Sequence, residues 1–439
     1  MSSEWIESSI GDICRNVFSG GTPKSTVPEY FDGGIPWLKT KEVNYCKITT
    51  TENSITDAGL KNSSAKLVPV NSVIVAMYGN GDTAGRVAIN KIELTTNQAC
   101  CNLVVDGNRA DYRFVYYYLK SQYAKLVDLK NGGAQQNLNA KLIKDYPIIV
   151  PPLIEQAAIG GFLEALDDRI ALLRETNATL EAIAQALFKS WFVDFDPVRA
   201  KQQGRPPESL DPATAALFPD DFEDTELGPV PKGWRVGTLG EIAAFQNGYA
   251  FKSKDWSDSG HPVVKIGDVK PGIIDFSGCT YVTPETTIGL NRFKLNRGDL
   301  LVGMTGYVGE VGLVPHVEPA AYLNQRVGRM GTQNGLADLG FIYCITRNPT
   351  FKKFAGAQSH GSAQANVSGT ALMEFPTLIP NEEILCKFNG ILSTLLEQII
   401  SSHEHAQTLA TLRDTLLPRL ISGQLRLPEA KSFVEEATA

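Results

Sequence analysis

The chain has 439 residues, of which 48 are acidic and 41 basic, so its formal net charge is −7. It contains no run of about 18 apolar residues, which argues against a membrane span, and its first residues lack the basic and apolar regions of a signal peptide. The seven cysteines are scattered without a C-x-x-C pair, which favours a reducing cytoplasm and argues against zinc and disulfides.

The charge is unevenly distributed along the chain. Residues 1–150 and 234–380 each carry a small excess of basic groups, whereas the acidic excess lies in the segments around them. Mildly basic globular segments are compatible with DNA binding, although they do not demonstrate it.

Residues 1–150 are predicted to form a mixed, strand-rich domain. Short apolar and β-branched runs at residues 72–78 and 101–105 are bounded by Gly and Asn turns, which is typical of strands. A helix is expected at residues 112–129. Prolines at residues 147–152 end this segment, since proline cannot continue a helix.

Residues 156–192 are predicted to form one long helix. Leucine recurs at every seventh position, and a second row that includes Leu163, Asn177, Ala184 and Trp191 lies three or four residues away. This spacing is typical of a coiled-coil seam, and a long amphipathic core helix is the alternative. A second, imperfect copy about 229 residues later, interrupted at Ser402 and Arg413, favours two paired helices. The predicted seam consists of Leu166, Ile170, Leu173, Leu180, Leu187, Leu395, Ile399, Leu409 and Leu416.

The second copy extends beyond the helices. Residues 234–380 match residues 1–150 at a shift of 226 to 229, which indicates a tandem duplication. The matched pairs include Trp5 and Trp234, Lys39 and Lys265, Met77 and Met304, Gln98 and Gln325, and Asn137 and Asn366.

The sequence therefore predicts an α+β architecture of strand-rich α/β domains and long helices. Its segments are a first domain (1–150), a first coiled-coil helix (151–193), a proline-rich acidic linker (194–233), a second domain (234–380), a second coiled-coil helix (381–427) and a tail (428–439). We expect the linker to be extended and the tail to fray.

Two similar halves suggest a pseudo-two-fold arrangement with an antiparallel coiled coil. A helix of this length would be a rod of roughly 55 Å, which is about one and a half turns of DNA. In this register Asn177 is expected opposite Ala406, where a polar group fixes the alignment, or alternatively faces solvent.

Four motifs resemble those of specificity subunits of type I restriction-modification systems. They are Pro151-Pro-Leu-Ile-Glu-Gln156, Phe162-Leu-Glu-Ala-Leu-Asp-Asp-Arg-Ile170, Ser190-Trp-Phe-Val-Asp-Phe-Asp-Pro197 and Glu226-Leu-Gly-Pro-Val-Pro-Lys-Gly-Trp234. The chain departs from the family pattern at Ile154, where the family more often has proline, and at residues 379–383, where the second copy of the first motif is degraded.

The resemblance implies two target-recognition domains that bind the halves of a split DNA site, held apart by an antiparallel coiled coil. It also implies partners: two methyltransferase subunits that carry S-adenosylmethionine and methylate adenine, and restriction subunits that translocate DNA, for which ATP and Mg are expected. No cofactor or metal is expected in this chain itself.

Catalytic motifs are absent from the sequence. It contains no Asp/Asn-Pro-Pro-aromatic tetrapeptide of amino-methyltransferases, and the glycine-rich residues 79–86 lack the lysine and spacing of a phosphate-binding loop. His403 and His405 have no third metal ligand nearby in the sequence. We therefore expect no catalysis by the chain alone. A self-contained nuclease or methyltransferase and a purely protein-binding scaffold are the competing hypotheses.

Candidate DNA contacts are polar and basic residues in predicted loops, because Arg and Lys suit guanine and phosphate while Asn and Gln suit adenine. Residues matched between domains that read different bases are likelier to hold the shared fold; we interpret Asn97-Gln98 and Asn324-Gln325 in this way. Lys39 and Lys265 are better candidates for phosphate than for bases. The predicted DNA contacts are Lys39, Lys41, Asn80, Thr83, Gln135, Gln136, Asn137, Lys265, Lys270, Tyr307, Glu310, His360, Ser362, Gln364 and Asn366.

The ends of the long helices carry more bulky apolar residues than a two-helix seam needs. These residues either pack against the chain's own domains or, as the resemblance implies, dock helices of the methyltransferase subunits. The predicted docking residues are Phe188, Trp191, Phe192, Leu417, Leu420 and Ile421.

Overall fold

The structure of the chain is a computed structural model that describes residues 5–79, 81–129, 137–225, 228–332, 336–359 and 366–438. The chain divides into two compact units. Unit 1 comprises Met1–Ile170 and Thr408–Ala439, and unit 2 comprises Ala171–Gln407.

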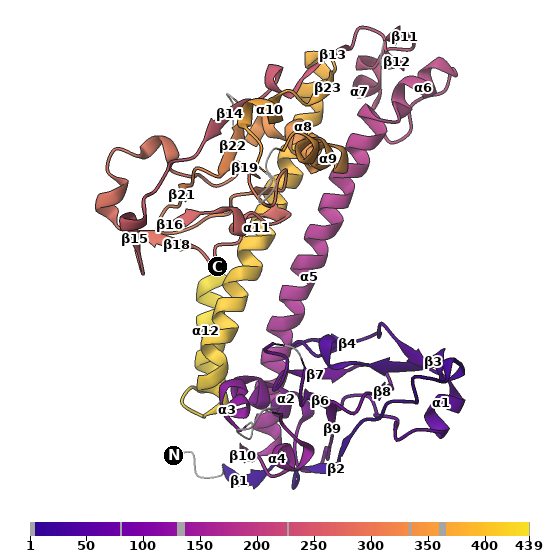
Figure 1. Cartoon of the computed structure of the whole chain (residues 1–439), viewed down its shortest axis with the longest axis vertical. Helices are drawn as coiled ribbons and strands as arrows, with labels where there is room; N and C mark the ends of the chain where they lie inside the picture. The colour runs from indigo at the N-terminus through magenta and orange to yellow at the C-terminus, as the bar shows by residue number, and fades with distance from the viewer. Residues whose placement is uncertain are drawn as a thin grey trace. The chain divides into compact units, whose positions relative to one another are not determined.

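The sheets of unit 1 are built from short strands. A five-stranded sheet has the order β2-β9-β6-β7-β4, a three-stranded sheet the order β5-β3-β8, and β1 pairs with β10. The strands are β1 (Ile6–Ser9), β2 (Cys14–Ser19), β3 (Phe31–Leu38), β4 (Lys47–Ile48), β5 (Ser54–Ile55), β6 (Val73–Ala76), β7 (Val87–Asn90), β8 (Thr95–Thr96), β9 (Cys100–Val105) and β10 (Pro147–Val150) (Figure 1).

The central strand β6 is buried on both faces. Val73 and Val75 belong to the core that contains the helix residue Phe114, whereas Ile74 and Ala76 belong to a second core. Because successive side chains of a strand point to opposite faces, this strand has a continuous apolar sequence rather than an alternating one.

The helices of unit 1 follow local start signals. Asp111 accepts hydrogen bonds from the backbone N–H groups of Arg113 and Phe114 and so caps α2. The predicted helix at residues 112–129 is divided in two at Gln122. The helices are α1 (Asp57–Lys61), α2 (Tyr112–Ser121), α3 (Tyr123–Asp128), α4 (Ala140–Lys144), α12 (Leu427–Thr438), the first part of α5 (Leu153–Phe192) and the last part of α11 (Glu382–Ile421).

Unit 2 repeats the sheet topology of unit 1. Its five-stranded sheet has the order β14-β22-β19-β20-β17, which matches that of unit 1 strand for strand, including the parallel pair at one edge. This agreement confirms the tandem repeat predicted from the sequence. The strands are β11 (Phe222–Thr225), β12 (Gly228–Pro231), β13 (Arg235–Thr238), β14 (Ala244–Asn247), β15 (Trp256–Ser257), β16 (His261–Val264), β17 (Gly272–Ile273), β18 (Thr280–Val282), β19 (Leu300–Gly303), β20 (Val311–Leu313), β21 (Tyr322–Leu323), β22 (Val327–Gly331) and β23 (Pro376–Ile379).

The helices that belong wholly to unit 2 are shorter than the two long ones. They are α6 (Asp196–Gln202), α7 (Pro212–Leu217), α8 (Leu336–Arg347), α9 (Pro349–Ala357) and α10 (Gly369–Met373).

The long helices α5 and α11 run antiparallel within unit 2. Asn177 Nδ2 lies 3.0 Å from Ile399 O, and further along, the ring centroids of Phe188 and Phe388 lie 6.3 Å apart. As the position on α5 advances, the contacting position on α11 therefore moves back. Asn177 is half-buried and lies opposite Ile399, so the predicted register opposite Ala406 was wrong by seven residues.

In unit 1 the two long helices are joined by an ion pair. The Arg413 guanidinium on α11 binds the Asp167 carboxylate on α5. Arg413 interrupts the heptad pattern in the sequence, but in the fold it supplies this contact between the helices. Of the predicted seam, Leu166, Ile170, Leu173, Ile399, Leu409 and Leu416 are buried, and Leu180, Leu187 and Leu395 are half-buried.

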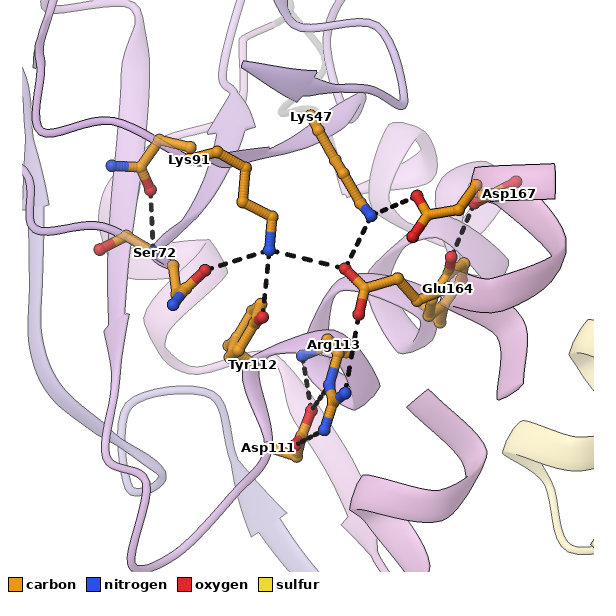
Figure 2. A network of polar contacts seen from close by, with 12 residues as sticks. Lys47, Ser72, Lys91, Asp111, Tyr112, Arg113, Glu164 and Asp167 are labelled. Atoms are coloured by element: carbon orange, nitrogen blue, oxygen red, sulfur yellow. Dashed lines mark hydrogen bonds and ion pairs between the residues drawn. The ribbon is translucent and has the colours of Figure 1, made fainter. Parts of the chain in front are cut away.

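A polar network connects the sheet of unit 1 to α5. Glu164 Oε1 lies 2.9 Å from Lys47 Nζ and 3.5 Å from Lys91 Nζ, and its Oε2 lies 3.6 Å from an amino group of Arg113 (Figure 2). Burial opposes ionisation of Glu164, but the Lys47 ammonium and the two other cations outweigh it, so the pKa of Glu164 is lowered. The network therefore holds the ionised Glu164 carboxylate of α5 against three cations from residues 1–150.

Residues 194–233 are not the extended linker that the prolines suggested. They form α6, α7 and the β11–β12 hairpin, and Val198, Phe218 and Val230 are buried, the first two in the main core of unit 2. The prediction failed because the apolar residues of this segment are spaced without a clear period, and their burial depends on a distant surface of the fold.

The tail is also folded. Residues from Leu427 to Thr438 form α12, and Ala430 is fully buried in the main core of unit 1. The expectation that this segment frays was wrong, because its few apolar residues find a hydrophobic surface in unit 1.

Candidate nucleic-acid interface

In each unit a loop follows the central strand of the five-stranded sheet. In unit 2 this is loop 304–310, between β19 and β20. Gly303 N lies 2.8 Å from Glu310 O, and Gly309 N lies 2.9 Å from Gly303 O, so the loop closes on its own backbone. Gly306 and Gly309 have φ values of 70° and 76°, a conformation that favours glycine. Tyr307 lies between them and is 63% exposed.

The corresponding loop of unit 1 spans residues 77–86. Its ends are joined by the Gly85 N to Ala76 O hydrogen bond of 2.8 Å. Arg86 binds the Asp82 carboxylate at 2.6 Å, and Tyr123 of α3 donates to the Asp82 carbonyl at 2.7 Å. Both loops are thus held by internal hydrogen bonds and by a neighbouring helix.

A second segment lies beside each loop. Leu138 N donates to Met77 O at 3.0 Å in unit 1, and Val367 N donates to Met304 O at 2.9 Å in unit 2. In unit 2, Thr305 Oγ1 also donates to Asn366 Oδ1 at 2.7 Å. The structure therefore brings the predicted residues Asn137 and Asn366, both exposed, next to the loops that follow the central strands.

Several predicted DNA contacts cannot be placed. Six of them lie outside the described residues: Asn80, Gln135, Gln136, His360, Ser362 and Gln364.

The matched lysines predicted to contact phosphate have contacts within the protein. Lys39 Nζ lies 2.9 Å from Asn53 Oδ1 and 4.9 Å from the centroid of the Trp37 ring. Lys265 Nζ lies 3.9 Å from the centroid of the Trp256 ring. Cations over indole rings are stabilised by the ring quadrupole, so both lysines help to hold the shared fold. Their contact with phosphate stays a prediction.

Three other predicted contacts, Lys41, Lys270 and Thr83, differ in their surroundings. Lys41 is exposed and binds Glu52, whose hydrogen bond raises the pKa of Lys41. Lys270 is exposed. Thr83 has a polar interaction of its own within the protein.

Glu310 is not a free acceptor for a cytosine amino group. Its side chain is 13% exposed and binds Lys352 at 2.6 Å and Arg347 at 3.7 Å. A half-buried carboxylate between two cations is better explained as part of the protein's own framework than as a base contact. The contact of Glu310 with DNA stays a prediction.

The matched Asn-Gln pairs occupy equivalent positions. A Cβ placed on Gly20 would lie 2.3 Å from Asn97 O, and one on Gly248 would lie 2.0 Å from Asn324 O, so both backbones approach closely at a shared glycine. Asn97 accepts from Cys100 Sγ at 3.3 Å, whereas Gln98 and Gln325 are exposed.

The same comparison shows a pair that the sequence reasoning missed. Lys24 and Lys252 follow the two shared glycines by four residues, at a shift of 228, and both are exposed. Extending the repeat alignment through these glycines would have found them. They are candidates for phosphate contact in each unit.

The predicted docking residues at the ends of the long helices are core residues. Phe188, Trp191 and Phe192 are at most 7% exposed and pack in unit 2, where the Trp191 and Phe218 rings stack edge to face at 5.0 Å. Leu417, Leu420 and Ile421 are at most 5% exposed and pack in unit 1. The prediction that these six side chains contact a partner is wrong, because the chain's own units bury them.

The described part of the chain contains neither a metal-binding cluster nor a membrane-spanning helix. No group of three or more His, Cys, Asp or Glu side chains there is arranged to hold a metal ion. No helix in those residues has the length and apolar character that crossing a bilayer requires.

The sequence and fold were compared with those of known proteins. A family model described as "Type I restriction modification DNA specificity domain" matches residues 2–182 and 231–411, that is, most of both halves. The chain is 27% identical over 437 residues to the type I restriction enzyme MjaIX specificity subunit of Methanocaldococcus jannaschii, covering 97% of this chain and 94% of that protein. It is 24% identical over 475 residues to the HindI specificity subunit of Haemophilus influenzae, covering 96% of this chain and 100% of that protein.

A solved structure shares the fold. The crystal structure of the type I restriction-modification system S subunit from M. genitalium superposes with a TM-score of 0.61 at 19% sequence identity, covering 95% of this chain and 96% of that one.

Proposed function

Because the chain belongs to the type I restriction-modification DNA specificity family, we propose that it recognises a bipartite DNA target and directs partner subunits to it. Specificity subunits are the non-catalytic components of these systems, so the chemistry lies in the partners.

The observation that carries this proposal is the repeated pair of loops. The five-stranded sheets of units 1 and 2 have the same strand order, and in each unit the loop after the central strand is hydrogen-bonded to a second polar segment. The framework of the five-stranded sheet is the same, but the loop sequences differ: at a shift of 227, the sequence has Asn80 where the second copy has Tyr307. Two domains with the same sheet but different residues in the loops are suited to bind two different half-sites.

We propose that the partners are two methyltransferase subunits and translocating restriction subunits. S-adenosylmethionine would be bound by the former, and ATP and Mg by the latter. The paired helices α5 and α11 would set the length of the unread spacer between the half-sites, because a helix pair is stiff along its axis.

Affinity and specificity would have different sources. Exposed lysines such as Lys24, Lys252 and Lys270 would contribute phosphate contacts, which weaken with rising salt. Discrimination would come from the loop residues, among them Asn137, Tyr307 and Asn366, which reach base edges.

Genome-wide mapping of adenine methylation tests the proposal. The chain is co-expressed with its methyltransferase in a host that lacks other adenine methylation, and a second strain lacks this chain. We expect a split motif of two short sequences with a fixed spacer, present only in the first strain. A continuous motif, or methylation that does not depend on the chain, would contradict the proposal.

The two competing hypotheses have distinct outcomes. A self-contained enzyme would methylate or cleave DNA when the purified chain is incubated with S-adenosylmethionine or Mg alone. A protein-only scaffold would show no sequence preference when the complex with the methyltransferase is tested by gel shift. We expect neither result.

A further inference from the structure

Arg347 lies between two carboxylates that belong to different elements of unit 2. Its Nε is 3.0 Å from Glu181 Oε1 on α5, and its Nη1 is 3.7 Å from Glu310 Oε1 in loop 304–310. The Arg347 side chain is only 19% exposed, and the two carboxylates are 22% and 13% exposed. One guanidinium therefore connects the loop after the central strand with a long helix.

Each carboxylate has a further partner. The Tyr343 hydroxyl on α8 donates to Glu181 Oε2, and Lys352 Nζ on α9 lies 2.6 Å from Glu310 Oε2. Burial and the Glu181 charge raise the pKa of Tyr343, so the phenol stays protonated and remains a donor. The two acids are balanced by two cations, and this part-buried group of charges is compensated.

The result is a loop held at several points. Gly309 packs against α9, since a Cβ placed on it would lie 2.9 Å from Ala355 Cβ. Thr305 donates a hydrogen bond to Asn366, and Glu310 accepts one from Lys352 and forms an ion pair with Arg347 at 3.7 Å. Tyr307 is the exposed aromatic residue on this fixed loop.

Unit 1 has only part of this arrangement. Lys120 corresponds to Arg347 at the shift of 227, and Arg86 takes the position of Glu310, because Ala76 N bonds to Arg86 O as Gly303 N bonds to Glu310 O. Lys120 Nζ lies 3.8 Å from Asp167 on α5, and Tyr117 donates to the same carboxylate at 2.7 Å. In both units, a cation and a tyrosine thus contact a carboxylate on α5. An acidic residue at the loop position of Glu310 is found in unit 2 and not in unit 1.

A buried ion pair is seldom retained for stability, because the cost of removing charges from water offsets the Coulombic gain. A fixed geometry is the better-supported use of such a group. Arginine suits this use, since its planar fork contacts two carboxylates at defined angles.

We propose that Arg347 is a positioning residue for recognition of the half-site that unit 2 binds. By holding Glu310 and Glu181 together, it fixes loop 304–310 against α5, so Tyr307 meets the DNA in one orientation. This inference rests on the proposed function of the chain and adds to it a residue that acts through the loop without touching DNA.

The test uses Glu310→Gln and Arg347→Lys in the complex with the methyltransferase. The first variant removes the charge of Glu310 and leaves the Arg347–Glu181 ion pair. The second puts lysine, the residue that unit 1 has at the corresponding position 120, in place of the arginine between the two carboxylates. Genomic sites with one altered base in the half-motif assigned to unit 2 should be methylated about tenfold more often, because one mismatch is worth that order of discrimination. Discrimination in the other half-motif should not change.

Lys353→Gln is the matched control. It removes an exposed cation from the same helix α9 but leaves Glu310 with both of its cations, and single exposed charges contribute little. Its discrimination should stay within about twofold of the wild type. The double variant Glu310→Gln/Arg347→Lys should methylate sites with one altered base at most about twofold more often than the stronger single variant. The reason is that residues of one network act non-additively.

A purely structural role gives a different pattern. It would lower the melting temperature of the complex and methylation at all sites together, with unchanged discrimination in both half-motifs, and this result would overturn the inference. If one variant fails to assemble, the other carries the same comparison. Failure of the proposed function itself is distinguishable, because then the wild-type complex would show no split motif.

Discussion

Side-chain amides on the long helices accept hydrogen bonds from backbone N–H groups of both units. Gln156 on α5 is 1% exposed; it accepts from Asp111 N at 3.0 Å and donates to Pro151 O at 2.8 Å. In unit 2, Asn389 on α11 accepts from Phe341 N at 2.8 Å. The Gln156 bonds satisfy backbone groups that would otherwise be buried without partners. They give a physical reason for a glutamine at the end of the motif at residues 151–156.

Gln156→Ala should destabilise unit 1. It leaves the Asp111 N–H and the Pro151 carbonyl without this partner in a buried site, which costs about 1–3 kcal/mol. Chemical denaturation of the purified chain, followed by tryptophan fluorescence and circular dichroism, measures the loss. Gln202→Ala, at an exposed position of α6, is the control and should change the unfolding free energy by less than about 0.5 kcal/mol. Equal effects of the two changes would contradict the role assigned to Gln156.

We expect His403 to make the stability of unit 2 depend on pH. Burial lowers the pKa of this imidazole; Glu404 and Asp275 act against the shift, and Arg174 adds to it. The folded state therefore favours the neutral ring, while the unfolded chain takes up a proton near the ordinary pKa of about 6.5. As the pH falls below that value, the unfolded state binds more protons than the folded state, and stability is lost.

The unfolding free energy of unit 2 should decrease from pH 7 to pH 5, and His403→Gln should make this decrease smaller. Urea denaturation at half-unit pH steps provides the measurement. The exposed His316, replaced by Gln in the same way, is the control and should leave the slope unchanged. An unaltered slope in His403→Gln would rule out this histidine as the source.

At the scale of elements, the last turns of α5 belong to the core of unit 2. Trp191 contacts the rings of Phe192, Phe218 and Phe388, and it is 1% exposed. The bulky apolar residues at this end of α5 are therefore covered by residues of segment 194–233 and by the other core residues of unit 2.

Trp191→Ala should cost about 3–5 kcal/mol of unfolding free energy, because it removes a large buried side chain and leaves a cavity. Ile183→Ala on the same helix is the matched control, since Ile183 is 48% exposed. The comparison is made by thermal and urea unfolding of the purified chain. A Trp191→Ala chain that is as stable as Ile183→Ala but no longer binds the methyltransferase would restore the docking hypothesis.

At the scale of the whole molecule, the repeat predicts that recognition is modular. Exchanging residues 1–150 for the corresponding segment of another specificity subunit should change one half of the methylated motif and leave the other half and the spacer unchanged. Methylation mapping of the exchanged complex measures this outcome. A change in both halves would show that the units do not bind DNA independently.

The structure adds a condition to that exchange. The first 150 residues contact the rest of unit 1 through Lys47 and Glu164 and through Tyr117 and Asp167. A donor segment that keeps a cation and a tyrosine at these positions should assemble. One that lacks them should lose the Lys47–Glu164 and Tyr117–Asp167 contacts and fold less stably, although Arg413 of α11 still pairs with Asp167.

Much of this protein follows from its sequence alone. The duplication, the strand-rich domains and the two long helices are visible because hydrophobic periodicity and a steady shift between copies are local, repeated signals. Leu166 and Leu173 are buried as the heptads indicate. The family motifs are likewise contiguous in sequence, and their resemblance to the specificity subunits agrees with the family match.

The tertiary structure decided the rest, since burial and pairing depend on groups far apart in the chain. The fold of residues 194–233, the position of α12 and the register of Asn177 against Ile399 all required the packed surfaces of the units. For the same reason Glu310 is a loop acid in the sequence but the partner of Arg347 in the fold. A sequence pattern specifies which face of an element is apolar, whereas only the assembled core determines what that face meets.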